Sequence, residues 1–184
     1  IKHAISATDA GTLLPGYKSF YKIIAQSNNA YKAINTAQGS TASAAVKAQG
    51  LGECRFMRAT AYYYLVSNWG AVPIVYDNVG QINEAPVRNK IEDVWKLIIQ
   101  DFRFAANNLP ASGVQGRLTK YSAEGMLARM YLMRAGLNQN GSRNQSDLDS
   151  AKYHAENVIT KSGLSLAPTY GELFQSSKHN SSNN

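Results

Sequence analysis

Apolar residues recur every three or four positions along most of the chain, which is the spacing of one face of an α-helix. In the first such stretch the apolar stripe runs from Tyr17 through Ile24 to Ile34. Glycine, proline and polar residues interrupt the pattern at intervals and mark where helices end. The pattern predicts five helices, at about residues 12–37, at about residues 42–68, from a cap at Asn89 to Pro110, from a cap at Thr119 to about residue 137, and from Ser146 or Asp147 to Gly163.

The second predicted helix is apolar on more than one face. Cys54 and Leu65 belong to one stripe, whereas Phe56 belongs to another, so this helix needs neighbours on several sides. Arg58 falls between the two stripes, and Asp101 lies beside the apolar stripe of the third helix. Because a buried charge needs a partner of opposite sign, we predict a structural ion pair between Arg58 and Asp101 across the helix interface.

Short links join the predicted helices, except for an irregular stretch at about residues 70–88. Short links make consecutive helices antiparallel. The predicted fold class is therefore all-α, built from tetratricopeptide-like antiparallel helix hairpins with one long irregular loop. Glu53 and Arg58 recur 71 positions later as Glu124 and Arg129, close to the length of two tetratricopeptide units of about 34 residues each. Stacked helix pairs of this kind form interfaces rather than catalytic centres.

Composition and charge argue against several classes of protein. Of the 184 residues, 44% are hydrophobic and 17% are charged, which is typical of a globular chain. The formal net charge is +7, but lysine and arginine are spread singly with no run of three. This distribution favours a mildly basic, solvated surface over a nucleic-acid-binding patch. The sequence contains no apolar run of about 18 residues that could cross a membrane.

Few residues belong to the types that bind metals or carry out catalysis. Cys54 is the only cysteine, which excludes an internal disulfide and a cysteine-based metal cluster. His3 and His179 lie near the ends of the chain, and the carboxylate nearest His154 along the sequence, Glu156, faces elsewhere on the helix. No phosphate-binding loop or metalloprotease motif is present. We therefore predict no metal, no cofactor and no catalytic residue.

Asn68 and Trp69 stand where the second predicted helix gives way to the irregular loop. Tryptophan can stack on the face of a sugar and asparagine can bind its hydroxyl groups, so both are candidate carbohydrate-binding residues. The favoured interpretation of Trp69 is nevertheless structural, as a plug at the end of the helices. Asn28 lies on the first apolar stripe and has the same two interpretations. The favoured interpretation is a core residue whose amide is satisfied by backbone groups.

Several segments resemble a known family. The segment ECRFMRATAYYYLV (residues 53–66), followed by NWGAVPIV (residues 68–75), resembles the signature of the SusD/RagB proteins, the nutrient-binding outer-membrane lipoproteins of Bacteroidetes. Two positions depart from the family pattern, Cys54 where alanine is frequent and Ala71 where aspartate is usual. The resemblance continues in register over residues 94–110, 116–123 and 127–132, and it covers roughly residues 17–175.

The resemblance implies a cell-surface subunit that captures an oligosaccharide or another nutrient for polysaccharide utilisation. Such a subunit works with a SusC-like TonB-dependent outer-membrane transporter, is lipid-anchored at the outer membrane, and is not an enzyme. Members of the family run to several hundred residues. We therefore expect residues 1–184 to be a single piece, the N-terminal helical part of a larger protein, with the lipid anchor and the C-terminal part outside it. No ligand-contacting residue of the family is carried over to this chain.

The sequence leaves two alternative classes of protein to be considered. A tetratricopeptide-type adaptor would bind a peptide along a concave face lined by asparagine, lysine and arginine. A helical enzyme acting on glycans would need two facing carboxylates about 5–9.5 Å apart, and the sequence offers no such pair.

Overall fold

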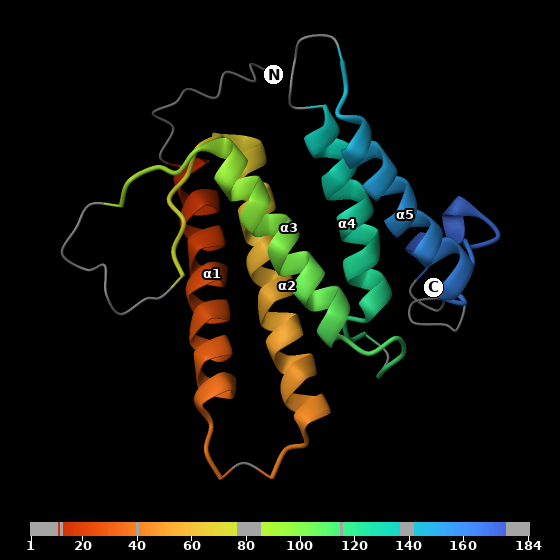
Figure 1. Cartoon of the computed structure of the whole chain (residues 1–184), viewed down its shortest axis with the longest axis horizontal. Helices are drawn as coiled ribbons and strands as arrows, with labels where there is room; N and C mark the ends of the chain where they lie inside the picture. The colour runs from red at the N-terminus through yellow and green to blue at the C-terminus, as the bar shows by residue number, and fades with distance from the viewer. Residues whose placement is uncertain are drawn as a thin grey trace. The chain divides into compact units, whose positions relative to one another are not determined.

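The computed structural model describes residues 11, 13–39, 41–76, 86–114, 116–136 and 142–175. These residues form five α-helices and one short 3-10 helix, without a β-strand (Figure 1). The chain divides into two compact units, residues 1–101 and residues 102–184. The predicted all-α fold is thus confirmed. The helices are α1 (Leu13–Thr36), α2 (Ala44–Trp69), α3 (Ile91–Asn108), α4 (Lys120–Ala135), α5 (Gln145–Lys161) and η1 (Tyr170–Phe174).

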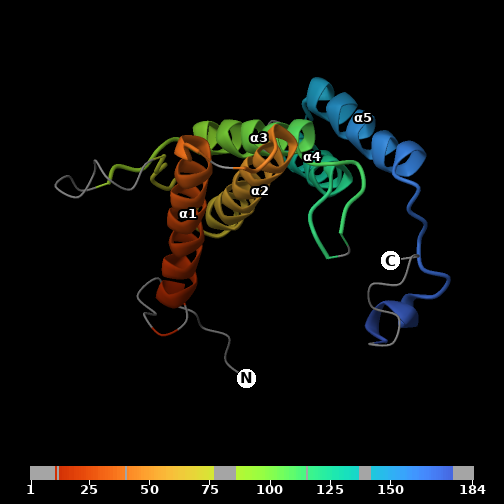
Figure 2. The same ribbon diagram turned by 90° about the horizontal axis from the view of Figure 1, so that it is seen from below.

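The first unit is built on a hairpin of α1 and α2, which run side by side in opposite directions (Figures 1 and 2). Gly39 in the connection has φ 67°, a conformation that costs glycine little because it lacks a Cβ atom. The Ser43 side chain accepts a hydrogen bond from the backbone N–H of Val46 and so caps α2. At the other end, Gly70 follows Trp69 with φ 68° and ends the helix.

The core of the first unit lies around α2. Ala59, Tyr62 and Leu65 of this helix are fully buried, together with Val94 and Ile98 from the part of α3 that belongs to this unit. Buried residues lie on several faces of α2, as its sequence pattern predicts. The helix is therefore held from several sides, which fixes the directions of the polar side chains that it carries.

The second unit contains the hairpin of α4 and α5, in which Leu127 and Met130 of α4 and Ala151 of α5 are buried. Thr119 caps α4 as predicted, through a reciprocal pair of hydrogen bonds with Ser122. α5 begins at Gln145, one or two positions before the predicted start at Ser146 or Asp147, and its cap is Asn144. The Asn144 side chain accepts a hydrogen bond from the backbone N–H of Asp147 there.

The predicted irregular stretch at residues 70–88 is non-helical wherever the structure describes it, which is at residues 70–76 and 86–88. Residues 77–85 lie outside the described part. Asn89 has a different role from the predicted helix cap. Its backbone N–H donates to the Val72 carbonyl, and its Oδ1 accepts a hydrogen bond from the backbone N–H of Ile74. Asn89 thereby holds the two sides of the irregular stretch together at their base.

The correspondence between the two halves of the sequence does not extend to the environment of the arginines. Arg58 is 5% exposed, whereas Arg129, 71 positions later, is an exposed residue of α4. Glu124 is buried, but Glu53 is only half-buried. Each unit contains a helix hairpin, but among the residues compared the buried arginine belongs to the first unit alone.

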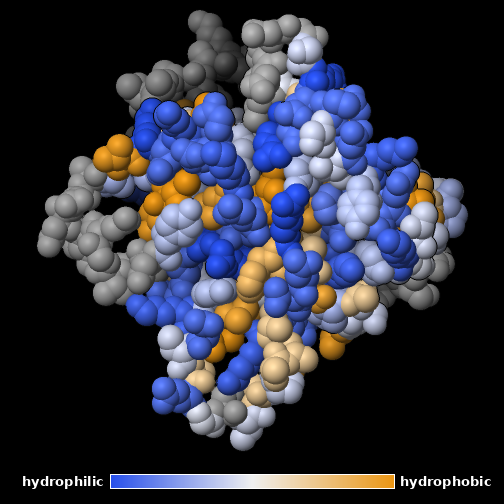
Figure 3. Space-filling view, viewed as in Figure 1, coloured by the Kyte–Doolittle hydropathy of each residue, from blue (hydrophilic) through white to orange (hydrophobic). Residues whose placement is uncertain are grey.

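On the face of the first unit visible in Figure 3, hydrophilic side chains predominate and hydrophobic ones appear in small patches between them. Among the described residues, no helix is both long enough and apolar enough to span a bilayer.

Candidate functional site

A buried charge network lies at the centre of the first unit. Asp101 on α3 has a side chain with 0% exposure, and it accepts hydrogen bonds from Arg58 Nε at 2.7 Å and from Arg58 Nη2 at 2.9 Å. The structure thus brings together the two residues predicted to pair. A third member was not predicted: Arg55 donates from Nη1 to Asp101 Oδ1 at 2.6 Å. One carboxylate therefore holds two guanidinium groups.

Asn28 extends this network from α2 to α1. Its Oδ1 accepts a hydrogen bond from Arg58 Nη1 at 2.8 Å, and its Nδ2 donates to the backbone carbonyl of Val75 at 2.9 Å. An amide is the side-chain group that supplies both an acceptor and a donor at this position. Asn28 is buried, as expected of a core residue, but only one of these two partners is the expected backbone group, and the other is a guanidinium group.

Tyrosines attach the extended segment after α2 to the helix hairpin. Tyr21 donates from its hydroxyl to the Pro73 carbonyl at 2.8 Å, and Tyr62 accepts from the backbone N–H of Val75 at 2.7 Å. Burial raises the pKa of Tyr62 to about 12, so its hydroxyl stays protonated at neutral pH. These bonds fix the backbone of residues 73–75, which lead directly into Tyr76.

A polar cleft of about 360 Å³ opens above this network, between α1, α2 and the end of the extended segment. The Arg55 guanidinium carbon lies 4.7 Å from the Tyr31 ring centroid, and the Arg58 guanidinium carbon lies 5.7 Å from the Tyr76 ring centroid. Tyr76 itself is 61% exposed. The cleft thus combines aromatic faces with amide, hydroxyl and cationic groups. Its lining residues are Asn28, Tyr31, Lys32, Asn35, Thr36, Arg55, Arg58 and Tyr76.

The surroundings of Arg55 keep its guanidinium group protonated. Partial burial on its own would lower the pKa of Arg55, but the hydrogen bonds to Tyr31 and Asp101 raise it above its usual value. The Arg55 side chain is 27% exposed, whereas that of Arg58 is 7% exposed. Arg55 therefore presents a positive charge at the wall of the cleft, and Arg58 lies deeper.

The two carbohydrate candidates from the sequence, Asn68 and Trp69, do not line the cleft. Asn68 donates from Nδ2 to the carbonyl of Tyr64 in its own helix. Trp69 is half-buried, and its ring meets Tyr17 edge to face with a centroid separation of 5.4 Å. Trp69 also contacts Phe20 of α1. These contacts are those of a residue that packs α2 against α1, which is the interpretation that the sequence favoured.

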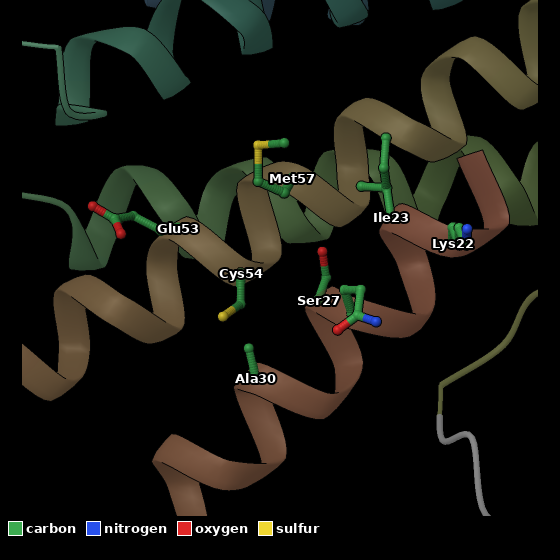
Figure 4. Close-up of a pocket in the computed structure, with 8 residues that line it drawn as sticks. Lys22, Ile23, Ser27, Ala30, Glu53, Cys54 and Met57 are labelled. Atoms are coloured by element: carbon green, nitrogen blue, oxygen red, sulfur yellow. The ribbon is translucent and has the colours of Figure 1, made fainter. Parts of the chain in front are cut away.

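A second, mainly apolar groove of about 450 Å³ lies between α1 and α2. Figure 4 shows Cys54 of α2 directed toward Ala30 of α1, with Ser27 nearby. Burial raises the pKa of the Cys54 thiol. Cys54 is thus a half-buried, largely protonated thiol at neutral pH.

The second unit contains one contact that the sequence analysis missed. His154 of α5 lies with Nδ1 at 2.5 Å from the carboxylate of Glu124 on α4, and its ring stacks on Tyr131. The spacing along the sequence pointed only to Glu156, which faces elsewhere on the helix, and it gave no sign of Glu124 because this partner comes from the neighbouring helix. Among the described residues, no group of three metal-ligating side chains is close enough to hold a metal ion.

The comparisons with known proteins agree with one another. A SusD-like family model, described as starch-binding and associating with the outer membrane, matches residues 1–132. A SusD-like protein of Bacteroides ovatus is 37% identical over 166 residues, which is 89% of this chain and 30% of that protein.

The solved structures that are similar to this chain include a member of the same family. A protein crystallised with a xylogluco-oligosaccharide is 34% identical, with a TM-score of 0.88, over 96% of this chain and 35% of that one. A SusD superfamily protein of Parabacteroides distasonis is 25% identical, with a TM-score of 0.82, over 91% of this chain and 36% of that one. The chain thus spans about a third of the length of the relatives that it matches. The chain belongs to the SusD-like family of carbohydrate-binding proteins.

Proposed function

We propose that this chain is the helical part of a cell-surface subunit that captures an oligosaccharide and passes it to a SusC-like TonB-dependent transporter. The subunit is lipid-anchored at the outer membrane through a residue outside this chain, and it binds its ligand without cleaving it. Membership of the SusD-like family supports this proposal, as does the relative crystallised with a xylogluco-oligosaccharide. The relatives are about three times as long, which supports a longer protein with residues 1–184 as its helical piece.

The observation that carries the proposal is the cleft beside the Arg58–Asp101 pair. A sugar ring has an apolar face, formed by its C–H groups, and a rim of hydroxyl groups. An exposed tyrosine such as Tyr76 can cover the apolar face, because the positive edges of C–H groups are attracted to the negative face of an aromatic ring. Asn35 and Thr36 supply hydrogen-bonding groups for hydroxyls in the same cleft. Ligand sites typically combine aromatic walls with a few fixed polar groups in this manner.

The test is oligosaccharide binding by the full chain and by its Tyr76→Ala variant. A glycan array identifies a binding oligosaccharide, and isothermal titration calorimetry then measures its affinity for each variant. We expect Tyr76→Ala to weaken binding by about tenfold, roughly 1.4 kcal/mol, since truncated aromatic contacts typically cost at least this much.

The matched control is Tyr153→Ala, because Tyr153 is 58% exposed and Tyr76 is 61% exposed, but Tyr153 lies in the other unit. An unchanged affinity in Tyr76→Ala would contradict the placement of the sugar in this cleft. Chromatography of the oligosaccharide after incubation tests the absence of hydrolysis, and released shorter products would contradict a purely binding role.

The transporter partnership is tested separately. We expect the tagged full-length protein, isolated from outer membranes in mild detergent, to bring with it a TonB-dependent barrel identified by mass spectrometry. Isolation of the protein without any such barrel would count against this part of the proposal and leave the carbohydrate-binding part unaffected.

A further inference from the structure

Residues 163–175, which follow α5, form an arm that carries large apolar side chains at the surface of the second unit. Among these residues Glu172 is the only charged one. A single exposed apolar side chain is ordinary in a folded protein, but several within one short segment mark a surface that contacts another surface. Four large apolar side chains of this apolar arm are between 58% and 95% exposed, namely Leu164, Leu166, Tyr170 and Phe174.

The backbone hydrogen bonds that the apolar arm makes with described residues are local. The backbone N–H of Glu172 donates to the Thr169 carbonyl, and that of Gln175 donates to the Glu172 carbonyl. The rings of Tyr170 and Phe174 meet each other, with centroids 5.1 Å apart. Figure 2 shows the arm in blue, beyond the end of α5 and away from α4 and α5. The arm thus has local structure, but the described helices leave its apolar surface uncovered.

The exposed face of α5 shows how a surface that faces water is built in the same unit. Asp149, Lys152 and Glu156 are exposed there, and Lys152 Nζ lies 3.7 Å from Glu156 Oε1. Charged side chains of this kind are typical of the solvent-facing side of a helix. The apolar arm has no such row of charges, so its surface is suited to contact with protein rather than with water.

The length of the relatives indicates what covers the apolar arm. They are about three times as long as this chain, so in each of them the same helical fold is joined to a larger stretch of polypeptide. A surface in the same polypeptide meets the arm at an effective concentration on the order of millimolar when the linker is short. A separate molecule reaches such a concentration only in a very concentrated solution. The surface that is always available to the arm is therefore one in the same polypeptide.

We propose that the apolar arm docks on the part of the full-length protein that lies outside residues 1–184. This inference rests on the proposed longer protein, and it names the surface through which the helical piece contacts the remainder. The surface that receives the arm is apolar, since it covers Leu166 and the ring pair of Tyr170 and Phe174. A second copy of the protein and the transporter are the competing partners, and the experiment separates them.

The first measurement is photo-cross-linking of the purified full-length protein, free of transporter and carbohydrate. The photo-reactive amino acid p-benzoylphenylalanine takes the place of Phe174, and mass spectrometry maps its cross-link after irradiation. We expect a cross-link within one chain, from position 174 to a residue outside 1–184. A cross-linked dimer would assign the arm to a second copy, and a cross-link to α4 or α5 would show that the arm folds back on its own unit. Either result overturns the proposal.

Limited proteolysis by chymotrypsin, which cleaves after leucine and aromatic residues, gives an independent measurement on the same full-length protein. We expect Leu166→Asp to speed cleavage after Tyr170 and Phe174 by about tenfold, because cleavage follows the population of the undocked arm. Ser165→Asp is the matched control, since it adds the same charge at an exposed neighbouring position. Neighbouring side chains of an extended segment lie on opposite sides, so we expect Ser165→Asp to change the rate by less than about twofold.

Three results of the proteolysis would contradict the docking of the arm on its own polypeptide. Rapid cleavage of the wild-type arm, at the same rate as in Leu166→Asp, would show that the arm is free in the purified protein. An equal acceleration in Leu166→Asp and Ser165→Asp would show an effect of charge rather than of the apolar contact. Protection that is lost when the protein is diluted would assign the arm to a second copy.

These measurements contain no sugar, so they are separate from the test of the proposed function. A free arm in a full-length protein that still binds an oligosaccharide would overturn the docking and leave the binding function in place. A docked arm in a protein that binds no oligosaccharide would support the docking and overturn the binding function.

Discussion

The Asp101→Asn substitution tests the charge network that holds the first unit together. Asparagine has nearly the same shape as aspartate, so the change removes a negative charge without opening a cavity. It leaves Arg58, whose side chain is 7% exposed, and Arg55, whose side chain is 27% exposed, without their shared counter-ion. Removing one partner of a buried ion pair typically costs about 3–5 kcal/mol, because the remaining charge is buried without compensation. That is a large share of the roughly 5–15 kcal/mol by which domains are stable.

Tryptophan fluorescence is the assay, because Trp69 and Trp95 are the only two tryptophans and both belong to the first unit. Fluorescence during urea denaturation therefore reports the unit that contains Asp101. A typical slope of about 1–3 kcal/mol per molar urea converts a loss of 3 kcal/mol into a midpoint shift of at least about 1 M. We expect the Asp101→Asn transition to move to lower urea by this amount.

The control is Asp93→Asn on the same helix. Asp93 has a side chain that is 47% exposed and pairs with exposed Lys96 at 3.1 Å. Pairs at the surface contribute little, so we expect a loss below about 1 kcal/mol there. If Asp101→Asn costs no more than Asp93→Asn, the network does not stabilise the unit and the reasoning is refuted. If Asp101→Asn costs as much in an Arg58→Met background as in the wild type, Arg58 and Asp101 are not energetically coupled, since contacting partners should show coupling.

Three further predictions concern Asn28, Cys54 and a pair of glycines. Asn28→Ala should lower the free energy of unfolding by about 1–3 kcal/mol in the same urea assay, because the Val75 carbonyl and an N–H of Arg58 both lose this partner. A loss below about 0.5 kcal/mol would contradict this prediction. Cys54 should react with iodoacetamide more slowly than free cysteine at pH 8, because its raised pKa keeps the thiol protonated, and its rate should approach that of free cysteine as the pH rises. Mass spectrometry measures the rate of alkylation. Equal rates at pH 8 would argue against the buried thiol. Gly125→Ala should stabilise α4 by about 0.5–1 kcal/mol in a thermal melt, since a Cβ atom there meets open space. Gly163→Ala should instead destabilise the protein, because Gly163 has φ 72°. The reverse order of stabilities would contradict the local geometry.

The positions of the helices could be predicted from the sequence because they depend on local periodicity. The ends of α1 and α4 follow from apolar stripes and from Thr119 as a cap, which are signals within a few residues of one another. The Arg58–Asp101 pairing also followed, because each residue sits among apolar positions where only a partner of opposite charge is tolerated. Predictions of this kind need only the pattern within one helix and the requirement that buried charges be paired.

The remaining contacts depend on the register between elements, which the sequence pattern does not reveal. Glu124 lies 30 positions from His154, and only the packing of α4 on α5 brings the two together. Asn89 has the sequence context of a helix cap, but its side chain bonds to Ile74 because the irregular stretch folds back on itself. Competition between a local cap and a distant backbone group is decided by tertiary structure, and local patterns favour the cap.

The contact of Arg55 with Asp101 has the largest consequence, because it changes how the buried pair can be tested. Exchanging the charges of Arg58 and Asp101 is the usual test of a pair, but here the arginine placed at position 101 would face Arg55, which lies 2.6 Å from the Asp101 carboxylate. Like charges at that distance repel strongly, so failure of the exchange to restore stability would not disprove the pairing. The coupling must instead be measured by neutral substitutions such as Asp101→Asn and Arg58→Met.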